Sequence, residues 1–250
     1  ALVITLMRRW HPVRDALARP GRLGRVLGCA LLIALNWGVY IYAVETRHVL
    51  QASLGYFLTP LVNVALGMLI LRERMAVLQG VAVALAAAAI LLQLVMLGTM
   101  PWISLVLALS FGTYGLLRKQ ILLDGLSGLF VETLLLLPVA LLVLLGMVEL
   151  GLSQFSGEVR TTLLLIASGV VTALPLLAFA GAARRLRLAT VGFLMYINPS
   201  MQFVIALLVF NEAITSIQVA SFALIWLALV LYSWSTWRTL QADRRRQTGL

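Results

Sequence analysis

The stretch INPSMQFVIALLVFNE, residues 197–212, begins with an Asn-Pro pair, continues as an apolar run and ends at one carboxylate. The same frame recurs as LTPLVNVALGMLILRE at residues 58–73. The two copies align without gaps at an offset of 139 residues, which pairs Pro60 with Pro199 and Glu73 with Glu212. A proline and an acid at matching places in two apolar segments indicate an internal repeat.

The composition of the whole chain is that of a membrane protein. Hydrophobic residues make up 62% of the 250 positions and charged residues only 11%, whereas soluble domains are roughly half apolar and a quarter charged. A transmembrane helix needs roughly 20 apolar residues. Eight segments meet this need, at about 26–46, 49–71, 76–97, 101–117, 128–149, 161–181, 188–210 and 215–237. The sequence therefore predicts an all-α, polytopic membrane protein with eight full transmembrane helices.

The basic residues indicate how these segments are oriented. If the loops alternate sides, 17 of the 19 Lys and Arg residues fall on one side, together with the C-terminus. The positive-inside rule makes that side cytoplasmic, so the net charge of +10 faces the cytosol and the lipid headgroups, and nucleic acid is not expected as a partner. Glu73 and Glu212 then lie on opposite sides, which makes the two repeats inverted. Inverted repeats are typical of secondary transporters, although some channels also have them.

The repeat also predicts how the chain is divided. We expect a first repeat at residues 1–97, a second repeat at 101–237 and a basic cytoplasmic tail at 238–250. The second repeat holds five predicted spans and the first only three, plus an apolar stub at the start. The expectation is therefore a chain that lacks about one and a half N-terminal helices of a five-plus-five arrangement. A genuine short form that begins with an interfacial stub is the alternative.

Most of the chain resembles the EamA family of the drug/metabolite transporter superfamily, and within it the RarD type. The stretches that carry the resemblance are NWGVYIYAV (36–44), HVLQASLGYFLTPLVNVALG (48–67), PWISLVLALSFGTYGLLRKQ (101–120), GLFVETLLLLPVAL (128–141) and LATVGFLMYINPSMQFVIALLVFNE (188–212). The resemblance implies a multi-pass permease of the bacterial inner (plasma) membrane with a cytoplasmic C-terminus. RarD-like proteins are labelled chloramphenicol-sensitive or drug permeases, so a small metabolite or drug is the implied substrate.

Polar side chains at membrane depth are costly and usually face protein or water, which makes them candidates for a solute site. They gather near the two prolines, which can break or kink a helix, and in the first and fourth predicted spans. The alternative for each is an interhelical contact or a kink that serves packing. The predicted substrate-binding residues are Asn36, Trp37, Tyr40, Tyr56, Asn63, Tyr114, Tyr196, Asn198 and Gln202, with helix breaks at Pro60 and Pro199. Asn63 and Gln202 match at the repeat offset.

Glu132 is a carboxylate inside an apolar run. It is a candidate for coupling transport to protons; the alternative is that it snorkels to the interface or pairs with Arg118 or Lys119. No catalytic set, cofactor motif or metal-ligand cluster is expected, because the chain has one cysteine and two histidines and its aspartates all fall in loops or tails. The sequence predicts a transporter that works by alternating access. A channel-like conduit, an intramembrane enzyme and a membrane scaffold are the alternatives, and a homodimer stays open.

Overall fold

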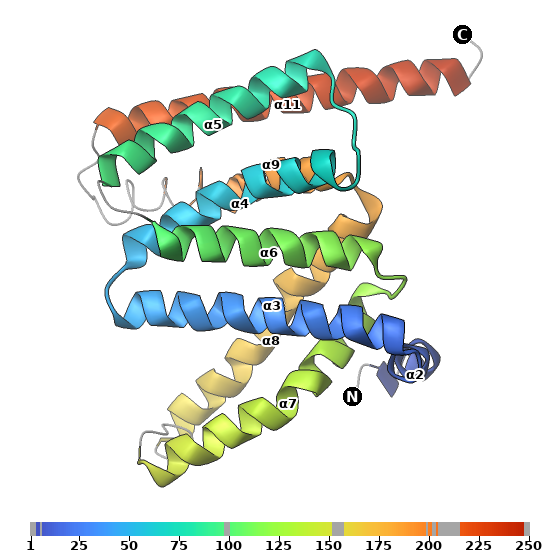
Figure 1. Cartoon of the computed structure of the whole chain (residues 1–250), viewed down its shortest axis with the longest axis vertical. Coiled ribbons are helices and arrows are strands. Elements are labelled where there is room, and N and C mark those ends of the chain that lie inside the picture. The colour runs from blue at the N-terminus through green and yellow to red at the C-terminus, as the bar shows by residue number, and fades with distance from the viewer. Residues whose placement is uncertain are drawn as a thin grey trace. The chain divides into compact units, whose positions relative to one another are not determined.

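The computed structural model describes residues 4–5, 7–97, 101–151, 158–198, 200–201, 204 and 216–247. Every regular element in these ranges is a helix (Figure 1). The helices are α2 (Trp10–Ala18), α3 (Pro20–Glu45), α4 (Val49–Leu69), α5 (Val77–Leu97), α6 (Trp102–Gln120), α7 (Gly125–Glu149), α8 (Val159–Arg185), α9 (Leu188–Met195) and α11 (Ser216–Gln247). The predicted all-α class is confirmed for this part of the chain.

Several of these helices are suited to cross a bilayer. Within the described residues, six are long and apolar enough: α3, α4, α5, α7, α8 and α11. Their surfaces agree with that role, because α8 leaves large apolar side chains such as Leu164 and Val171 exposed, a surface that lipid tolerates and water does not. The segment predicted at 101–117 coincides with α6, and the segment predicted at 188–210 begins with the eight-residue helix α9. The chain is a multi-pass membrane protein, and the number of eight spans stays a prediction.

The chain forms two compact units that are described separately. Unit 1 comprises Ala1–Leu35 and Leu117–Leu186, and unit 2 comprises Asn36–Leu116 and Arg187–Leu250. Each unit draws on both halves of the sequence. The boundaries fall inside α3 and α6, so each of these helices contributes residues to both units.

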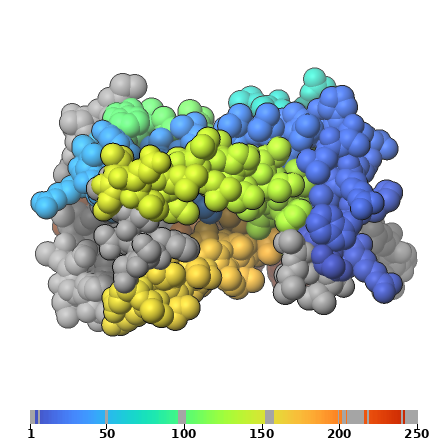
Figure 2. Space-filling model, turned by 90° about the horizontal axis from the view of Figure 1, so that it is seen from below, coloured from blue at the N-terminus to red at the C-terminus, as the bar shows by residue number. Residues whose placement is uncertain are grey.

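Unit 1 contains α2, α7 and α8. Helix α2 packs against α7 near the start of α7 (Figure 2). There the rings of Trp10 and Phe130 meet edge to face, with their centroids 5.8 Å apart. Asp124 caps α7, since its carboxylate accepts a hydrogen bond from the backbone N–H of Ser127 at 3.1 Å. Partial burial alone would raise the pKa of Asp124, but the Ser127 hydrogen bonds and the attraction of Arg9 hold it below its usual value.

Unit 2 is built from two helix pairs, with α4 against α9 and α5 against α11 (Figure 1). Its core is apolar and aromatic, and Phe193 of α9 stacks on Tyr232 of α11 with ring centroids 3.9 Å apart. Small buried residues lie at helical spacing on α5, at Ala82, Ala86 and Ala89. Small side chains let two helix backbones approach closely, which explains the tight α5–α11 pair.

Candidate functional site

The centre of the candidate site is the contact between α4 and α9 in unit 2. Pro60 lies inside α4, and the helix continues through it from Val49 to Leu69. Proline removes one backbone donor from the helix. One residue before it, the Thr59 hydroxyl donates to the carbonyl of Gly55 at 2.8 Å, which satisfies that side chain within its own helix.

Gly192 brings α9 directly onto this part of α4. A Cβ atom at residue 192 would lie 2.7 Å from the carbonyl oxygen of Pro60 and 3.0 Å from Cβ of Asn63. Any larger residue would therefore force the two helices apart. Next to this contact, Nδ2 of Asn63 donates to Sδ of Met195 at 3.3 Å. The close approach places Asn63 against the last turn of α9.

Two polar atoms at this contact are buried without a hydrogen-bond partner among the described residues. They are Oδ1 of Asn63 and the hydroxyl of Tyr196, and both residues are 0% exposed. Leaving a buried polar group unsatisfied costs about 1–3 kcal/mol. Tyr196 follows α9 directly and its ring packs edge to face on Phe193 at 5.9 Å. The contact thus holds an amide oxygen and a phenol with unused hydrogen-bonding capacity, next to an apolar and aromatic core.

Asn36, Trp37 and Tyr40 lie on α3. The side-chain amide of Asn36 donates to the Leu107 carbonyl and to the Ser110 hydroxyl, both at 2.9 Å, which confirms the interhelical contact weighed as its alternative. The ring of Tyr40 meets that of Tyr56 on α4 at 6.0 Å. Trp37 is exposed. The structure thus joins α3 to α6 through Asn36 and α3 to α4 through the two tyrosines.

The remaining predicted residues are more scattered. Tyr114 is fully buried on α6, and its ring packs against Phe111 at 5.8 Å. Asn198 is exposed. Gln202 and Pro199 lie outside the described residues. The matching of Asn63 with Gln202, and the helix break at Pro199, therefore stay predictions.

Glu132 belongs to unit 1 and forms a buried ion pair. Its carboxylate lies 3.3 Å from Nη1 of Arg118, and both side chains are almost fully buried. Arg118 also donates from Nη2 to the carbonyl of Gly125 at 3.1 Å. A Cβ at Gly128 would collide with the guanidinium, so this glycine makes room for it. Pairing with Arg118, one of the alternatives for Glu132, is confirmed.

Glu73 has a role that the sequence did not indicate. Its carboxylate accepts hydrogen bonds from the backbone N–H groups of Leu188 at 2.9 Å and Ala189 at 3.2 Å. These are the first two residues of α9. The N-cap residue of this helix, Arg187, makes no capping hydrogen bond with its side chain. A carboxylate at the end of α4 does not complement the dipole of that helix. That mismatch was the available signal that Glu73 serves another helix.

Comparison with known proteins agrees with this arrangement of apolar helices. The model of the EamA-like transporter family matches residues 1–95. An uncharacterized transporter of Vibrio cholerae is 46% identical over 246 residues, which cover 98% of this chain and 82% of that protein. Protein RarD of Streptomyces exfoliatus is 44% identical, with 98% and 78% covered, and Protein RarD of Escherichia coli is 40% identical, with 92% and 78% covered. The chain therefore belongs to the EamA-like transporter family, as a RarD-like membrane transporter.

Proposed function

We propose that the protein is a secondary-active permease of the bacterial inner membrane, with its C-terminus in the cytoplasm, that moves a small metabolite or drug by alternating access. The observation that carries the proposal is the pair of buried, unsatisfied polar atoms on Asn63 and Tyr196 where α4 meets α9. Buried polar groups that are unsatisfied in the empty site gain hydrogen bonds when a polar solute enters, which favours binding of a solute there.

The helix starts support inverted repeats as the framework of this transport. Helix α4 begins at Val49 and α9 at Leu188, while α5 begins at Val77 and α11 at Ser216. Both pairs are separated by 139 residues, the offset of the sequence repeat. Each helix also packs against its own counterpart, as expected when a twofold axis runs between equivalent elements. Substrate sites in such transporters lie at the interface between the repeats.

We assign Asn63 and Tyr196 as the central solute contacts. Tyr40 and Tyr56, whose rings meet, would form an aromatic wall. The other predicted contacts belong to the wider cavity wall in this proposal: Asn36, Trp37, Tyr114, Asn198 and Gln202. Glu132 would serve coupling only if its ion pair with Arg118 breaks during the cycle, because the two side chains are buried against each other.

The packing favours gated transport over an open conduit. The residues around Tyr196 in the unit 2 core are apolar or aromatic, including Phe57, Val64 and Phe222. A channel needs a continuous polar path, whereas the Phe193–Tyr232 stack and the Gly192–Pro60 approach close this region. A scaffold without transport would have no use for two unsatisfied buried polar atoms.

The test uses the full-length protein in proteoliposomes with a panel of labelled amino acids, amines and drugs. We expect gradient-dependent flux of at least one solute, and a loss of that flux in Tyr196→Phe. Because the Tyr196 hydroxyl has no described partner, removing it should leave the thermal stability unchanged or raised. A purely structural tyrosine would not combine lower flux with equal stability. Tyr42→Phe is the matched control, since Tyr42 is exposed and should retain full flux. A constant conductance without gradient-dependent flux would contradict the proposal.

A further inference from the structure

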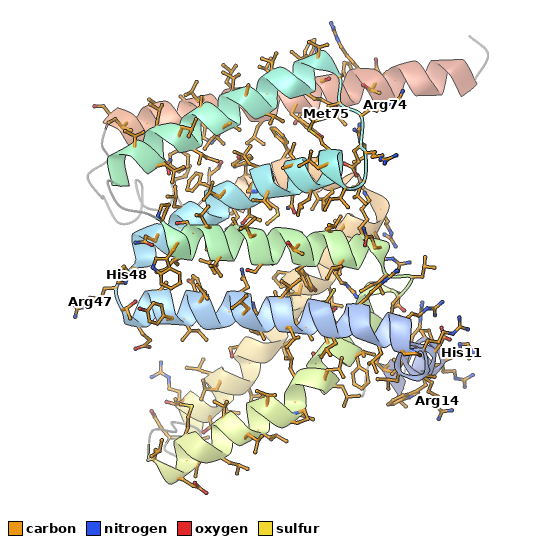
Figure 3. All side chains as sticks on the ribbon, in the orientation of Figure 1. His11, Arg14, Arg47, His48, Arg74 and Met75 are labelled. Carbon is orange, nitrogen blue, oxygen red and sulfur yellow. The ribbon has the colours of Figure 1, made fainter. Side chains whose placement is uncertain are left out.

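The link between α4 and α5 folds back across the end of α4. The backbone N–H of Glu73 donates to the carbonyl of Gly67 at 2.9 Å, and Arg72 has a φ of 53°. Arg74 and Met75 lie on this link (Figure 3). The reversal carries the Glu73 side chain toward the start of α9, so a residue of the first sequence half reaches a helix of the second.

The Glu73 carboxylate is well suited to hold α9. It accepts from two successive N–H groups, those of Leu188 and Ala189, at a helix end that carries partial positive charge. A Cβ at Gly67 would lie only 2.8 Å from Oε2 of Glu73. The glycine therefore leaves the space that the carboxylate occupies, and we call this arrangement the Glu73 clamp.

Further contacts gather at the same end of α9. The guanidinium of Arg187 donates to the carbonyl of Arg74, which ties the link to the residue before α9 a second time. On another side, the hydroxyls of Thr190 and Tyr232 are 3.3 Å apart. Leu188 and Ala189 are themselves fully buried. This end of the α4–α9 pair is closed.

The position of the Glu73 clamp links it to the candidate solute site. Gly192, which touches Pro60 and Asn63, lies one helical turn beyond Leu188. Helix α9 cannot move away from Asn63 at this end unless the two hydrogen bonds to Glu73 break. By the charge distribution along the sequence, this end faces the cytoplasm.

We propose that the Glu73 clamp is the cytoplasmic gate of the transporter: it holds the α4–α9 pair closed, and its release opens Asn63 and Tyr196 to the cytoplasm. Glu73 is thus a positioning residue that acts through α9 and does not touch the solute. The inference rests on the proposed transport function. If Glu73 were only a helix cap that stabilises the fold, its replacement would change access to the site from both sides of the membrane.

The experiment measures access to the site from each side of the membrane. The full-length protein carries Met195→Cys as a reporter, because Met195 contacts Asn63, in a background without other reactive cysteines. Cys29 is replaced by alanine, although it is buried. Right-side-out and inside-out vesicles are treated with a membrane-impermeant thiol reagent. The rate at which the reporter thiol at position 195 is labelled is compared between the reporter protein with Glu73 intact and the same protein with Glu73→Gln. Glu149→Gln is the matched control, since Glu149 is an exposed acid at the end of α7.

We expect Glu73→Gln to raise cytoplasmic labelling about tenfold, the change that corresponds to weakening one or two hydrogen bonds to a charged group. Labelling from the outside should not rise, Glu73→Asp should restore part of the closed state, and the control should match the parent. Equal rises on both sides would show general loosening and overturn the gate, and so would unchanged labelling. A one-sided rise in a protein without flux for any solute would refute the transport function and leave the clamp standing as a one-sided closure.

Discussion

Replacing Glu132 with Gln should strongly destabilise unit 1, because it leaves a buried guanidinium without its counter-charge. Arg118 and Glu132 lie 3.3 Å apart with almost no exposure. At an effective dielectric constant of about 20, two unit charges at this distance attract by about 5 kcal/mol. Desolvation of both groups offsets much of that gain, yet removing one partner of a buried pair costs about 3–5 kcal/mol. We expect a loss of that size for Glu132→Gln.

The double variant Arg118→Met/Glu132→Leu provides the decisive comparison. Removing both charges abolishes the attraction and also the desolvation cost, so its free energy of unfolding should lie within about 1 kcal/mol of the parent, or above it. The double-mutant cycle is completed with Arg118→Met and Glu132→Leu as the single variants, and it should give a coupling of at least about 5 kcal/mol, because each single variant leaves one buried charge unpaired. The unfolding free energies can be measured by titrating sodium dodecyl sulfate into dodecyl maltoside micelles and following tryptophan fluorescence.

The pair formed by Arg9 and Asp124 serves as the control in the same unit. Its charged atoms are 3.8 Å apart and its side chains are 47% and 29% exposed, so its coupling should stay below about 1 kcal/mol. If Glu132→Gln costs no more than the exposed pair, and the cycle shows no coupling, the reasoning about the buried pair is refuted.

Three further predictions concern single sites. Gly192→Ala should push α9 away from the Pro60 carbonyl, which would lie 2.7 Å from the new Cβ. We expect it to lower the free energy of unfolding by about 1–3 kcal/mol and to abolish flux in the proteoliposomes. Gly38→Ala is the control that should keep its flux, because a Cβ there would have nothing within 4 Å. Asn36→Leu should cost about 1–3 kcal/mol in the same detergent titration, because it removes two buried hydrogen bonds and leaves an α6 carbonyl without that donor. Asp124 has a lowered pKa in the folded protein, so its contribution to stability is present above the ordinary carboxyl pKa of about 4 and is lost as the pH falls below it. Asp124→Asn should therefore make the melting temperature depend less on pH between about pH 5 and about pH 3. A melting temperature that falls with pH as steeply as in the parent would contradict this.

The apolar runs predicted the starts of several helices closely. The predicted spans at 49, 188 and 215 compare with helix starts at Val49, Leu188 and Ser216. Some other helix boundaries were less well predicted, because hydropathy detects lipid-compatible residues and not helix. Helix α3 begins at Pro20, six residues before the predicted 26. Proline is favoured at a first helical position, and the arginines of the first turns lower the hydropathy without breaking the helix.

The site could be predicted only in part, because its contacts join segments far apart in the chain. A polar residue in an apolar run indicates burial, and Asn36, Asn63 and Tyr196 are indeed buried. Which atoms remain unsatisfied depends on how α9 approaches α4. That approach is possible because Gly192 has no side chain. The partner of Glu73 is 115 residues away, beyond the reach of any local pattern.

Helix α11 runs for 32 residues, from Ser216 to Gln247. At 1.5 Å per residue it is about 48 Å long, whereas the hydrocarbon layer is about 30 Å thick. Trp234 and Trp237 are exposed near the place where Arg238 lies over the Trp234 ring at 5.2 Å, a combination suited to the headgroup level. The remaining turns extend past the lipid as a rigid stalk. A fluorescent protein fused after this helix would therefore be held away from the headgroups, and its orientation would report the tilt of α11.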